Sequence, residues 1–245
     1  MIQEPRVIAD SLSWTLLEKP HGLPSAPLKI DETLNLTSWF LDRFPEGRNV
    51  KGYKDIEFGL VHRLDTATTG LVLFAKTQSA FDFFKQQQER DQINKTYHAL
   101  STRLSDAFAS PWTEISQFRS WGPGRKEVRP VYRGMKGWID GGKEYRTEIR
   151  DIEPVDFPSY DYNSSGKTVL IECNITKGFR HQIRSHLSMR GYPIIGDRLY
   201  HPGWKGVPES EDPPLQLFAT GIRFIDPDSM KQAVFSLQPP DKRNR

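Results

Sequence analysis

The 245-residue sequence predicts an α+β fold: a mixed, mostly antiparallel sheet flanked by helices. Its second half is dominated by segments in which apolar and polar residues alternate, which is the period of a half-buried strand. Helical patterns do not alternate with those segments, and this argues against a doubly wound parallel sheet. The first half adds two segments with the four-residue apolar spacing of helices. We expect a single domain over residues 1–245, since a chain of this length has room for one substantial core.

The first half of the chain is expected to contain two strands and two helices. Residues 14–17 predict a short buried strand, and the proline-containing segment 19–24 after it predicts a rigid loop. Asp31 is expected to cap a helix that ends before Pro45. The remaining two elements are a buried strand at 70–76 and a helix at 78–90 with Phe81 and Phe84 toward the core.

The second half is expected to be mainly strands. Turn-forming residues at 161–166 predict a hairpin between two of them. Residues 180–190 predict a helix that stops at Gly191, and the segment 202–214, rich in Pro, Gly and acids, predicts an exposed loop. The strand patterns lie at 145–149, 169–175, 218–224 and 233–237.

The composition is that of a soluble globular protein, with 36% hydrophobic and 27% charged residues. The net charge is only +3, so affinity for a nucleic acid would have to come from local basic clusters. Cys173 is the only cysteine, which excludes an intrachain disulfide, and its alternating surroundings indicate a strand core residue rather than a reactive thiol. We expect a cytoplasmic protein, because residues 1–11 lack the apolar core of a signal peptide and 70–75 are too few to span a bilayer.

One local basic cluster lies in the second half. It is interleaved with Trp121 and Tyr132, a combination typical of surfaces that grip single-stranded RNA. A solvated β-ribbon is the other interpretation, because charge runs usually face water. The cluster consists of Arg119, Arg125, Lys126, Arg129, Arg133 and Lys136.

The segment 61–70 is the most informative one for chemistry. Asp65 stands just ahead of a predicted buried strand, where a side chain can face a cleft. From spacing alone, an acid that caps a turn is the simpler interpretation, with His62 and Arg63 exposed beside it.

Five motifs, in the same order along the chain, resemble the RluA-like branch of the RNA pseudouridine synthases. Together they span nearly the whole chain, and five ordered elements are far more specific than any one of them. They are Lys19-Pro20-His21-Gly22, His62-Arg63-Leu64-Asp65 with Thr68-Thr69-Gly70, Lys95-Thr96-Tyr97-His98-Ala99, residues 178–187 (GFRHQIRSHL), and Gly196-Asp197 with Tyr200.

The resemblance implies the pseudouridine synthase fold with a central RNA-binding cleft, and it implies roles for particular residues. Asp65 would be the catalytic carboxylate, acting as nucleophile or as base. Arg184 would pair with Asp65 and keep it ionised, and Tyr97 would stack on the uracil. From the residues alone, an exposed helix arginine is the commoner state for Arg184, and a half-buried strand aromatic is an equal alternative for Tyr97. Arg63 would fill the space that a flipped uridine leaves. The expected RNA contacts are His62, Arg63, Lys95, Arg119, Arg125, Lys126, Arg129, Arg180 and His181.

The chain departs from the family pattern at three places. Thr69 replaces the usual Ser, Phe179-Arg180 stands where Arg-Thr is usual, and Phe218 stands where His is common. These changes put substrate contacts in question more than the reaction, because none of them alters Asp65, Tyr97 or Arg184. We also expect no N-terminal S4-type RNA-binding domain of the kind that many relatives carry.

The expected activity is the isomerisation of uridine to pseudouridine in tRNA or ribosomal RNA by a monomer, without cofactor or metal. The reaction is redox-neutral and consumes no second substrate. A non-catalytic RNA-binding protein on the same scaffold is one alternative, although it would have no reason to keep Asp65, Tyr97 and Arg184 together. A hydrolase acting on a glycosidic bond is another, but it would need a second acid to activate water.

Overall fold

The computed structural model describes residues 2–29, 31–104, 107, 109, 111–155, 167–204 and 213–240. The chain divides into two compact units: unit 1 comprises residues 1–95 and 218–237, and unit 2 comprises residues 96–217 and 238–245. Each unit combines mostly antiparallel strands with helices, which confirms the predicted α+β class. The expectation of one catalytic domain stays a prediction. No helix among the described residues has both the length and the apolar composition that a bilayer span requires.

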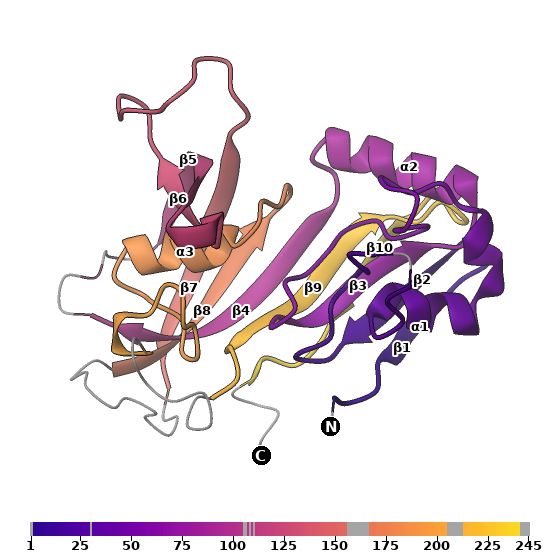
Figure 1. Ribbon diagram of the computed structural model, residues 1–245, viewed down its shortest axis with the longest axis horizontal. Helices are drawn as coiled ribbons and strands as arrows, with labels where there is room; N and C mark the ends of the chain where they lie inside the picture. Colours follow the sequence, from indigo (N-terminus) through magenta and orange to yellow (C-terminus); the bar gives the residue numbers. More distant parts are fainter. Residues whose placement is uncertain are drawn as a thin grey trace. The chain divides into compact units, whose positions relative to one another are not determined.

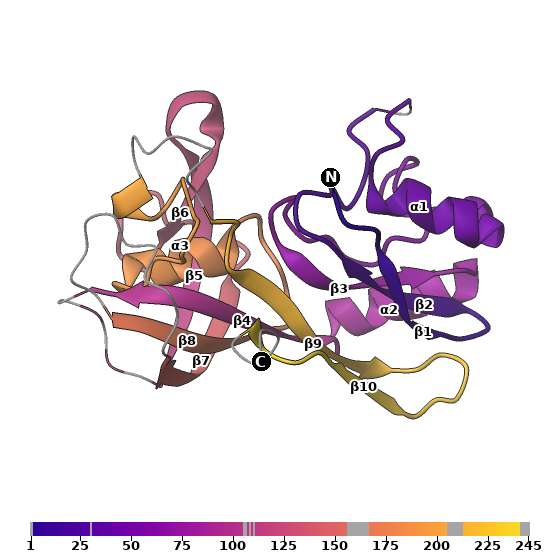
Figure 2. The same ribbon diagram turned by 90° about the horizontal axis from the view of Figure 1, so that it is seen from below.

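Unit 1 is built on a sheet that begins with an antiparallel meander. β1 pairs with β2 and β2 with β3, both antiparallel, whereas β9 runs parallel to β3. β10 folds back on β9 as an antiparallel partner, which can be followed in Figure 2. The strands are β1 (Arg6–Asp10), β2 (Trp14–Lys19), β3 (Thr69–Ala75), β9 (Leu217–Ile225) and β10 (Gln232–Ser236).

Helices cover both faces of this sheet (Figure 1). Leu73 of β3 belongs to the core cluster that contains Phe84 of α2, and Phe84 packs edge-on against Phe224 at 5.4 Å. The next residue, Phe74, points to the opposite face because side chains alternate along a strand. There it stacks on Phe40 of α1 at 4.4 Å. The helical segments of unit 1 are α1 (Leu36–Arg43), the 3-10 helix η1 (Pro45–Asn49) and α2 (Gln78–Glu89).

The predicted cap of α1 is wrong. The helix begins at Leu36, and its N-cap is Asn35, whose side chain accepts a hydrogen bond from the Ser38 amide at 2.9 Å. Asp31 lies four residues earlier, in a turn. Both residues are good N-caps, so sequence alone could not choose between them, and the burial of Leu36 fixes where the helix starts.

The described residues of unit 2 form strands in the order β4-β8-β7-β5-β6. β7 and β8 are antiparallel neighbours, as the predicted hairpin requires, while its turn at 161–166 lies outside the described residues. Most of the predicted loop 202–214 also lies outside them. Cys173 is fully buried in β8, which confirms its assignment to the strand core. The strands are β4 (Asn94–Arg103), β5 (Trp112–Trp121), β6 (Glu127–Val131), β7 (Tyr145–Pro154) and β8 (Lys167–Ile175).

The helix α3 (Gln182–Met189) packs on β6 and β7, with Ile183 and Leu187 buried as predicted. It ends where Gly191 takes a positive φ of 80°, which confirms the predicted stop. Two short 3-10 helices, η2 (Pro123–Arg125) and η3 (Pro202–Trp204), complete the unit.

Candidate active site

Asp65 of unit 1 lies on the loop that leads from Val61 into β3. The loop is tied to the neighbouring strand, because the Val61 amide donates to the Leu73 carbonyl at 3.0 Å. It is tied on its other side by Ser25, whose hydroxyl accepts from the Leu64 amide at 3.0 Å and donates to the Leu64 carbonyl at 2.8 Å. A turn closes at Asp65 itself, where the Thr68 amide donates to the Asp65 carbonyl at 3.0 Å. The backbone on both sides of Asp65 is therefore fixed.

Lys19, in the first of the five motifs, is a second anchor for this loop. Its buried ammonium donates to the carbonyls of Pro20, Leu23 and Thr66 at 3.0, 2.7 and 3.0 Å. The Gly22 amide donates to the same Thr66 carbonyl at 3.0 Å. The proline-containing loop is thus bonded to the residue next to Asp65.

Two opposing effects act on the pKa of the Lys19 ammonium. Burial lowers the pKa of Lys19 to about 7, and the negative charge of Asp65 acts in the opposite direction. The two side chains are therefore close enough to influence one another. The three carbonyl bonds use all three N–H groups of an ammonium, so this position suits the protonated form of Lys19.

Gly70 is required where β3 meets β9. Its φ is +129°, and a Cβ there would lie 2.2 Å from the carbonyl oxygen of Ala219, its register partner. The preceding pair in the register joins Thr69 to Phe218. Two of the family departures, the Thr and the Phe, therefore face each other across the parallel pair that follows the Asp65 loop.

His62 and Arg63 have different surroundings. The His62 ring accepts a hydrogen bond from the Leu73 amide at its Nε2 (3.3 Å), and its Nδ1 is buried. Burial, with a contribution from the charge of Lys95, holds the pKa of His62 well below its usual range, so the ring is neutral. Arg63 is exposed and donates to the buried Glu57 carboxylate at 2.9 Å. Arg63 thus has the accessibility that an RNA contact needs, whereas Nε2 of His62 is bonded to the backbone of β3.

Lys95 at the start of β4 is buried, with 6% of its surface exposed, and burial lowers its pKa to about 8. Its position offers little surface to a phosphate, and its role as an RNA contact stays a prediction.

In unit 2, Tyr97 lies on β4 and Arg184 on α3, and both are buried. The Arg184 guanidinium forms a two-point ion pair with Asp197, donating from Nε at 2.7 Å and from Nη2 at 2.8 Å. Asp197 also accepts from the amides of Leu199 and Tyr200. The pairing of Arg184 with Asp65, which belongs to unit 1, stays a prediction.

The segment that enters α3 is fixed by side-chain contacts. His181 takes a left-handed conformation (φ 55°) as the N-cap and lies 3.1 Å from the Tyr200 hydroxyl through Nδ1. That hydroxyl accepts from the Val128 amide at 2.7 Å, and burial raises the pKa of Tyr200 to about 12. The side chain of Gln182 caps the Phe179 amide at 3.0 Å. The His181 ring is therefore part of a packed network, and its assigned contact with RNA stays a prediction.

The unusual pair Phe179-Arg180 has a structural explanation. Phe179 stacks on Phe118 of β5, with ring centroids 5.0 Å apart and an interplanar angle of 6°. Arg180 donates from Nη2 to the carbonyls of Arg125 and Glu127, at 2.6 and 3.4 Å. Both residues therefore tie the start of α3 to the β5–β6 hairpin. An RNA contact by Arg180 would have to share its guanidinium with this bond.

The β5–β6 hairpin carries the other predicted RNA-binding residues. Arg119, Arg125, Lys126 and Arg129 are all exposed on it, and the Arg129 guanidinium lies over the ring of Trp121 at 4.3 Å. Trp121 is itself 52% exposed. The hairpin thus presents cations and an aromatic face to solvent.

Two residues that were not predicted as site residues have buried contacts near predicted ones, one in each unit. Lys19 and Asp197 both lie in motifs that were matched, but their contacts are with Thr66 and Arg184, which sequence spacing does not reveal. The signal that could have revealed them is a charged residue at a position expected to be buried, because a buried charge requires a partner.

The chain belongs to the RNA pseudouridylate synthase family, whose model matches residues 13–189. It is 28% identical over 186 residues to the Ribosomal large subunit pseudouridine synthase D of Nitrosomonas europaea, covering 76% of this chain and 46% of that protein. It is also 28% identical over 191 residues to the RNA pseudouridine synthase YhcT of Bacillus subtilis, which covers 78% of this chain and 55% of that protein. The chain spans about half the length of the curated relatives that it matches.

Solved structures with the same fold include the Human RNA Pseudouridylate Synthase Domain Containing 1, with a TM-score of 0.70 and 21% identity over 97% of this chain and 84% of that one. The Human RNA Pseudouridylate Synthase Domain Containing 4 follows with a TM-score of 0.63 and 20% identity, covering 96% of this chain and 88% of that one. At these identities the likeness shows the fold alone, and it confirms the predicted pseudouridine synthase fold.

Proposed function

We propose that this chain converts uridine to pseudouridine in RNA, with Asp65 as the catalytic carboxylate. The family match over residues 13–189 carries the proposal, since it includes the segment with Asp65 and the helix with Arg184. The fixed backbone around Asp65 supports it, because a catalytic group has to be held in place by its surroundings. We further infer that the chain works in the cytoplasm as a monomer.

The reaction requires the bond between N1 of uracil and C1′ of ribose to break and a bond from C5 to C1′ to form. The hydrogen on C5 is lost and N1 gains one, so no electrons are exchanged with another molecule. A carboxylate suits the first step, as a nucleophile or as a base. We assign Tyr97 to stacking on the uracil and Arg184 to the electrostatic environment of the carboxylate. Asp65 belongs to unit 1 and the other two to unit 2, so the proposal requires both units for one reaction.

Ribosomal RNA is the first substrate to test, because several relatives are named ribosomal large subunit pseudouridine synthases. Transfer RNA is the second. In either case a flipped uridine costs about a few kcal/mol in lost stacking and pairing, which phosphate contacts have to offset.

The test is Asp65→Asn, a nearly isosteric change that removes the negative charge. Wild-type protein should form pseudouridine in large-subunit ribosomal RNA or transfer RNA from a strain that lacks the gene, and Asp65→Asn should form none. RNA binding should stay within a few-fold of wild type. Asp55→Asn, an exposed carboxylate of the same unit, is the matched control and should keep full activity. The readout is carbodiimide mapping of pseudouridine.

Activity of Asp65→Asn within a few-fold of wild type would refute the assignment of the carboxylate. A wild-type protein that binds RNA but modifies none of the cellular RNAs would instead favour the non-catalytic RNA-binding alternative.

A further inference from the structure

Residues 132–144 form an excursion from the sheet of unit 2 that the proposed reaction does not use. Val131 at the end of β6 pairs with Gln117 of β5, and Tyr145 at the start of β7 pairs with Ser116, the adjacent position of the same strand. The chain therefore leaves β5 and returns one register position away, after thirteen residues.

The excursion is held in a defined conformation from within unit 2. The Gln117 side chain donates to the Ile139 carbonyl at 2.6 Å and accepts from the Ile139 amide at 3.0 Å. A Cβ on Gly142 would lie 2.6 Å from the Gln117 amide nitrogen, so this close contact requires glycine. At the start of the loop, the Tyr132 hydroxyl donates to the buried Glu114 carboxylate at 2.7 Å, and Arg190 pairs with that carboxylate. Both ends and the middle of the loop are thus anchored.

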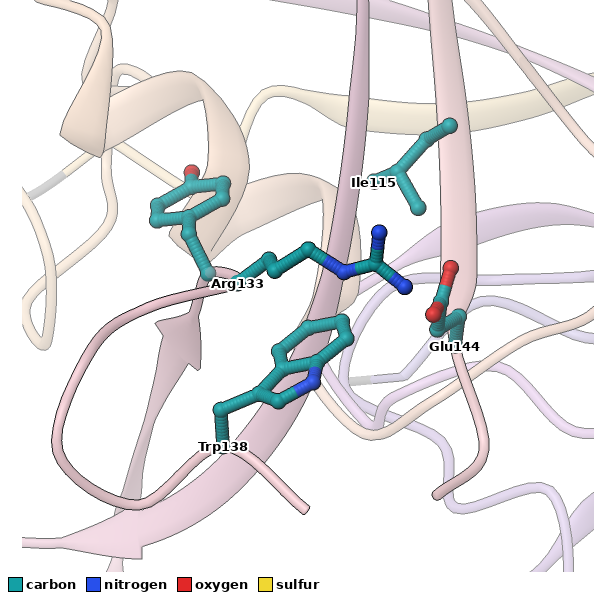
Figure 3. Close-up of a pocket in the computed structure, with 5 residues that line it drawn as sticks. Ile115, Arg133, Trp138 and Glu144 are labelled. Carbon is teal, nitrogen blue, oxygen red and sulfur yellow. The ribbon is translucent and has the colours of Figure 1, made fainter. Parts of the chain in front are cut away.

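The anchored loop and β5 line an open pocket of about 470 Å³. This volume lies within the roughly 300–1,000 Å³ range of small-molecule sites. Figure 3 shows the Arg133 guanidinium extending across it between Trp138 and Ile115, toward Glu144. Within the described part of the chain, neither Arg133 nor Glu144 has an ion-pair partner within 4.0 Å. Four lining side chains are available to a ligand: the flat indole of Trp138, the aliphatic Ile115, the donor fork of Arg133 and the carboxylate of Glu144. Tyr132 completes the lining, with its hydroxyl bonded to Glu114.

The cations around the pocket favour a polyanion, whereas the carboxylate inside the pocket disfavours a phosphate. Arg119 packs against the loop, since a Cβ on Gly137 would lie 2.8 Å from its guanidinium carbon. Arg125, Lys126 and Arg129 are exposed on the same β5–β6 hairpin. The Glu144 carboxylate would repel a phosphate that entered, whereas it would accept hydrogen bonds from an uncharged group. A nucleic acid base fits this combination, because its phosphates can stay with the outer cations while the base enters.

We propose that this pocket binds one unpaired guanine of the RNA, separate from the uridine that is modified. Guanine presents two neighbouring donors, N1–H and the N2 amino group, which a carboxylate such as Glu144 can accept together. It also presents O6 and N7 as acceptors for an arginine fork such as Arg133. Trp138 supplies a face for stacking. On their base-pairing edges, adenine, cytosine and uracil offer no pair of neighbouring donors. An acceptor atom would instead face one carboxylate oxygen, which is unfavourable. This proposal rests on the proposed function insofar as RNA is the substrate.

The experiment compares two short RNAs without uridine, 5′-CCGCC-3′ and 5′-CCACC-3′, with binding followed by fluorescence anisotropy. Wild-type protein should bind the guanine RNA about tenfold more tightly, since one two-point base contact is worth about 1–3 kcal/mol. Glu144→Gln should reduce that preference to about twofold or less. Trp138→Leu should weaken both RNAs about tenfold through lost stacking. Glu153→Gln, an exposed carboxylate on β7 outside the pocket, is the matched control and should keep the preference. Circular dichroism verifies that each variant is folded.

Equal affinity of wild type for the two RNAs, no measurable binding of either, or a preference that survives in Glu144→Gln would overturn the proposal. Failure of this proposal and failure of the proposed function give different results. A chain that prefers guanine but forms no pseudouridine refutes the activity alone, and a chain that forms pseudouridine without the preference refutes the pocket alone.

Discussion

Arg184 and Asp197 form an ion pair from which water is nearly excluded, with side chains 9% and 0% exposed. Burial of two charges is costly, and only good geometry with further hydrogen bonds offsets that cost. Here the geometry is two-point, and the amides of Leu199 and Tyr200 also donate to the carboxylate. Arg184 therefore has a structural role in unit 2 in addition to the catalytic role that we propose.

Asp197→Asn should destabilise the protein strongly, because it leaves the buried Arg184 charge without compensation. The expected loss is about 3–5 kcal/mol in the free energy of unfolding, measured by urea denaturation. Glu148→Gln is the matched control: it breaks the exposed pairs of Glu148 with Arg146 and Arg150, and it should cost about 0–1 kcal/mol. Equal losses for the two variants would show that the Arg184–Asp197 pair adds nothing to stability.

At the scale of elements, the β5–β6 hairpin is the surface best suited to phosphate contacts. Its cations are exposed, and its base is held to α3 by the Phe118–Phe179 stack and by the bonds from Arg180. A rigid base lets exposed cations meet a polyanion without the entropic cost of ordering the backbone.

Neutralising Arg125 and Lys126 together to Gln should weaken RNA binding and reduce its dependence on salt. The slope of log affinity against log salt should become shallower by about one to two units, because fewer counterions are released. The same change at Arg223 and Lys231, two exposed cations of unit 1, should leave the slope nearly unchanged. An identical slope for wild type and the Arg125/Lys126 variant would return the hairpin to a solvated β-ribbon.

The whole molecule should be sensitive to mild acid, because it buries neutral histidines. His186 is fully buried between the hydroxyls of Ser116 and Thr147, at 2.8 and 2.9 Å, and burial lowers its pKa to about 3. Burial likewise lowers the pKa of His201 to about 4. Above pH 6.5 both rings are neutral in the folded and unfolded chain alike. Below pH 6.5 the unfolded chain binds protons that the folded chain does not, so stability is lost as the pH falls toward 4.

Each of these histidines should lower the free energy of unfolding by about 2 kcal/mol between pH 6.5 and pH 5. Urea denaturation of wild type at pH 7 and pH 5 measures the total loss. His186→Gln cannot take up the proton, so its loss over the same interval should be smaller by about 2 kcal/mol, whatever its stability at pH 7. A parallel dependence in wild type and variant would show that His186 is not buried as a neutral ring.

Local patterns in the sequence were sufficient for most strands and helices and for the family. The alternating apolar residues from Val169 to Ile175 are buried in β8, although Leu170 and Asn174 on its other face are buried too. The helix 78–90 has Phe81 and Phe84 on its inner side as predicted. The five motifs indicated the family because each is a run of neighbouring residues that resembles the family pattern, and one of them contains Asp65. These features are short-range, so the sequence records them directly.

Contacts between distant residues were decided only by the tertiary structure. Lys19 bonds to Thr66, Gln117 to Ile139, and Arg184 to Asp197, across intervals of 47, 22 and 13 residues. Each interval brings together groups whose desolvation requires a partner, and which partner they meet depends on strand register and loop path. The choice of Asn35 over Asp31 as the cap followed from the burial of Leu36 in the same way. The sequence by itself therefore determined the family and most of the elements, and the packing of those elements determined which polar groups meet.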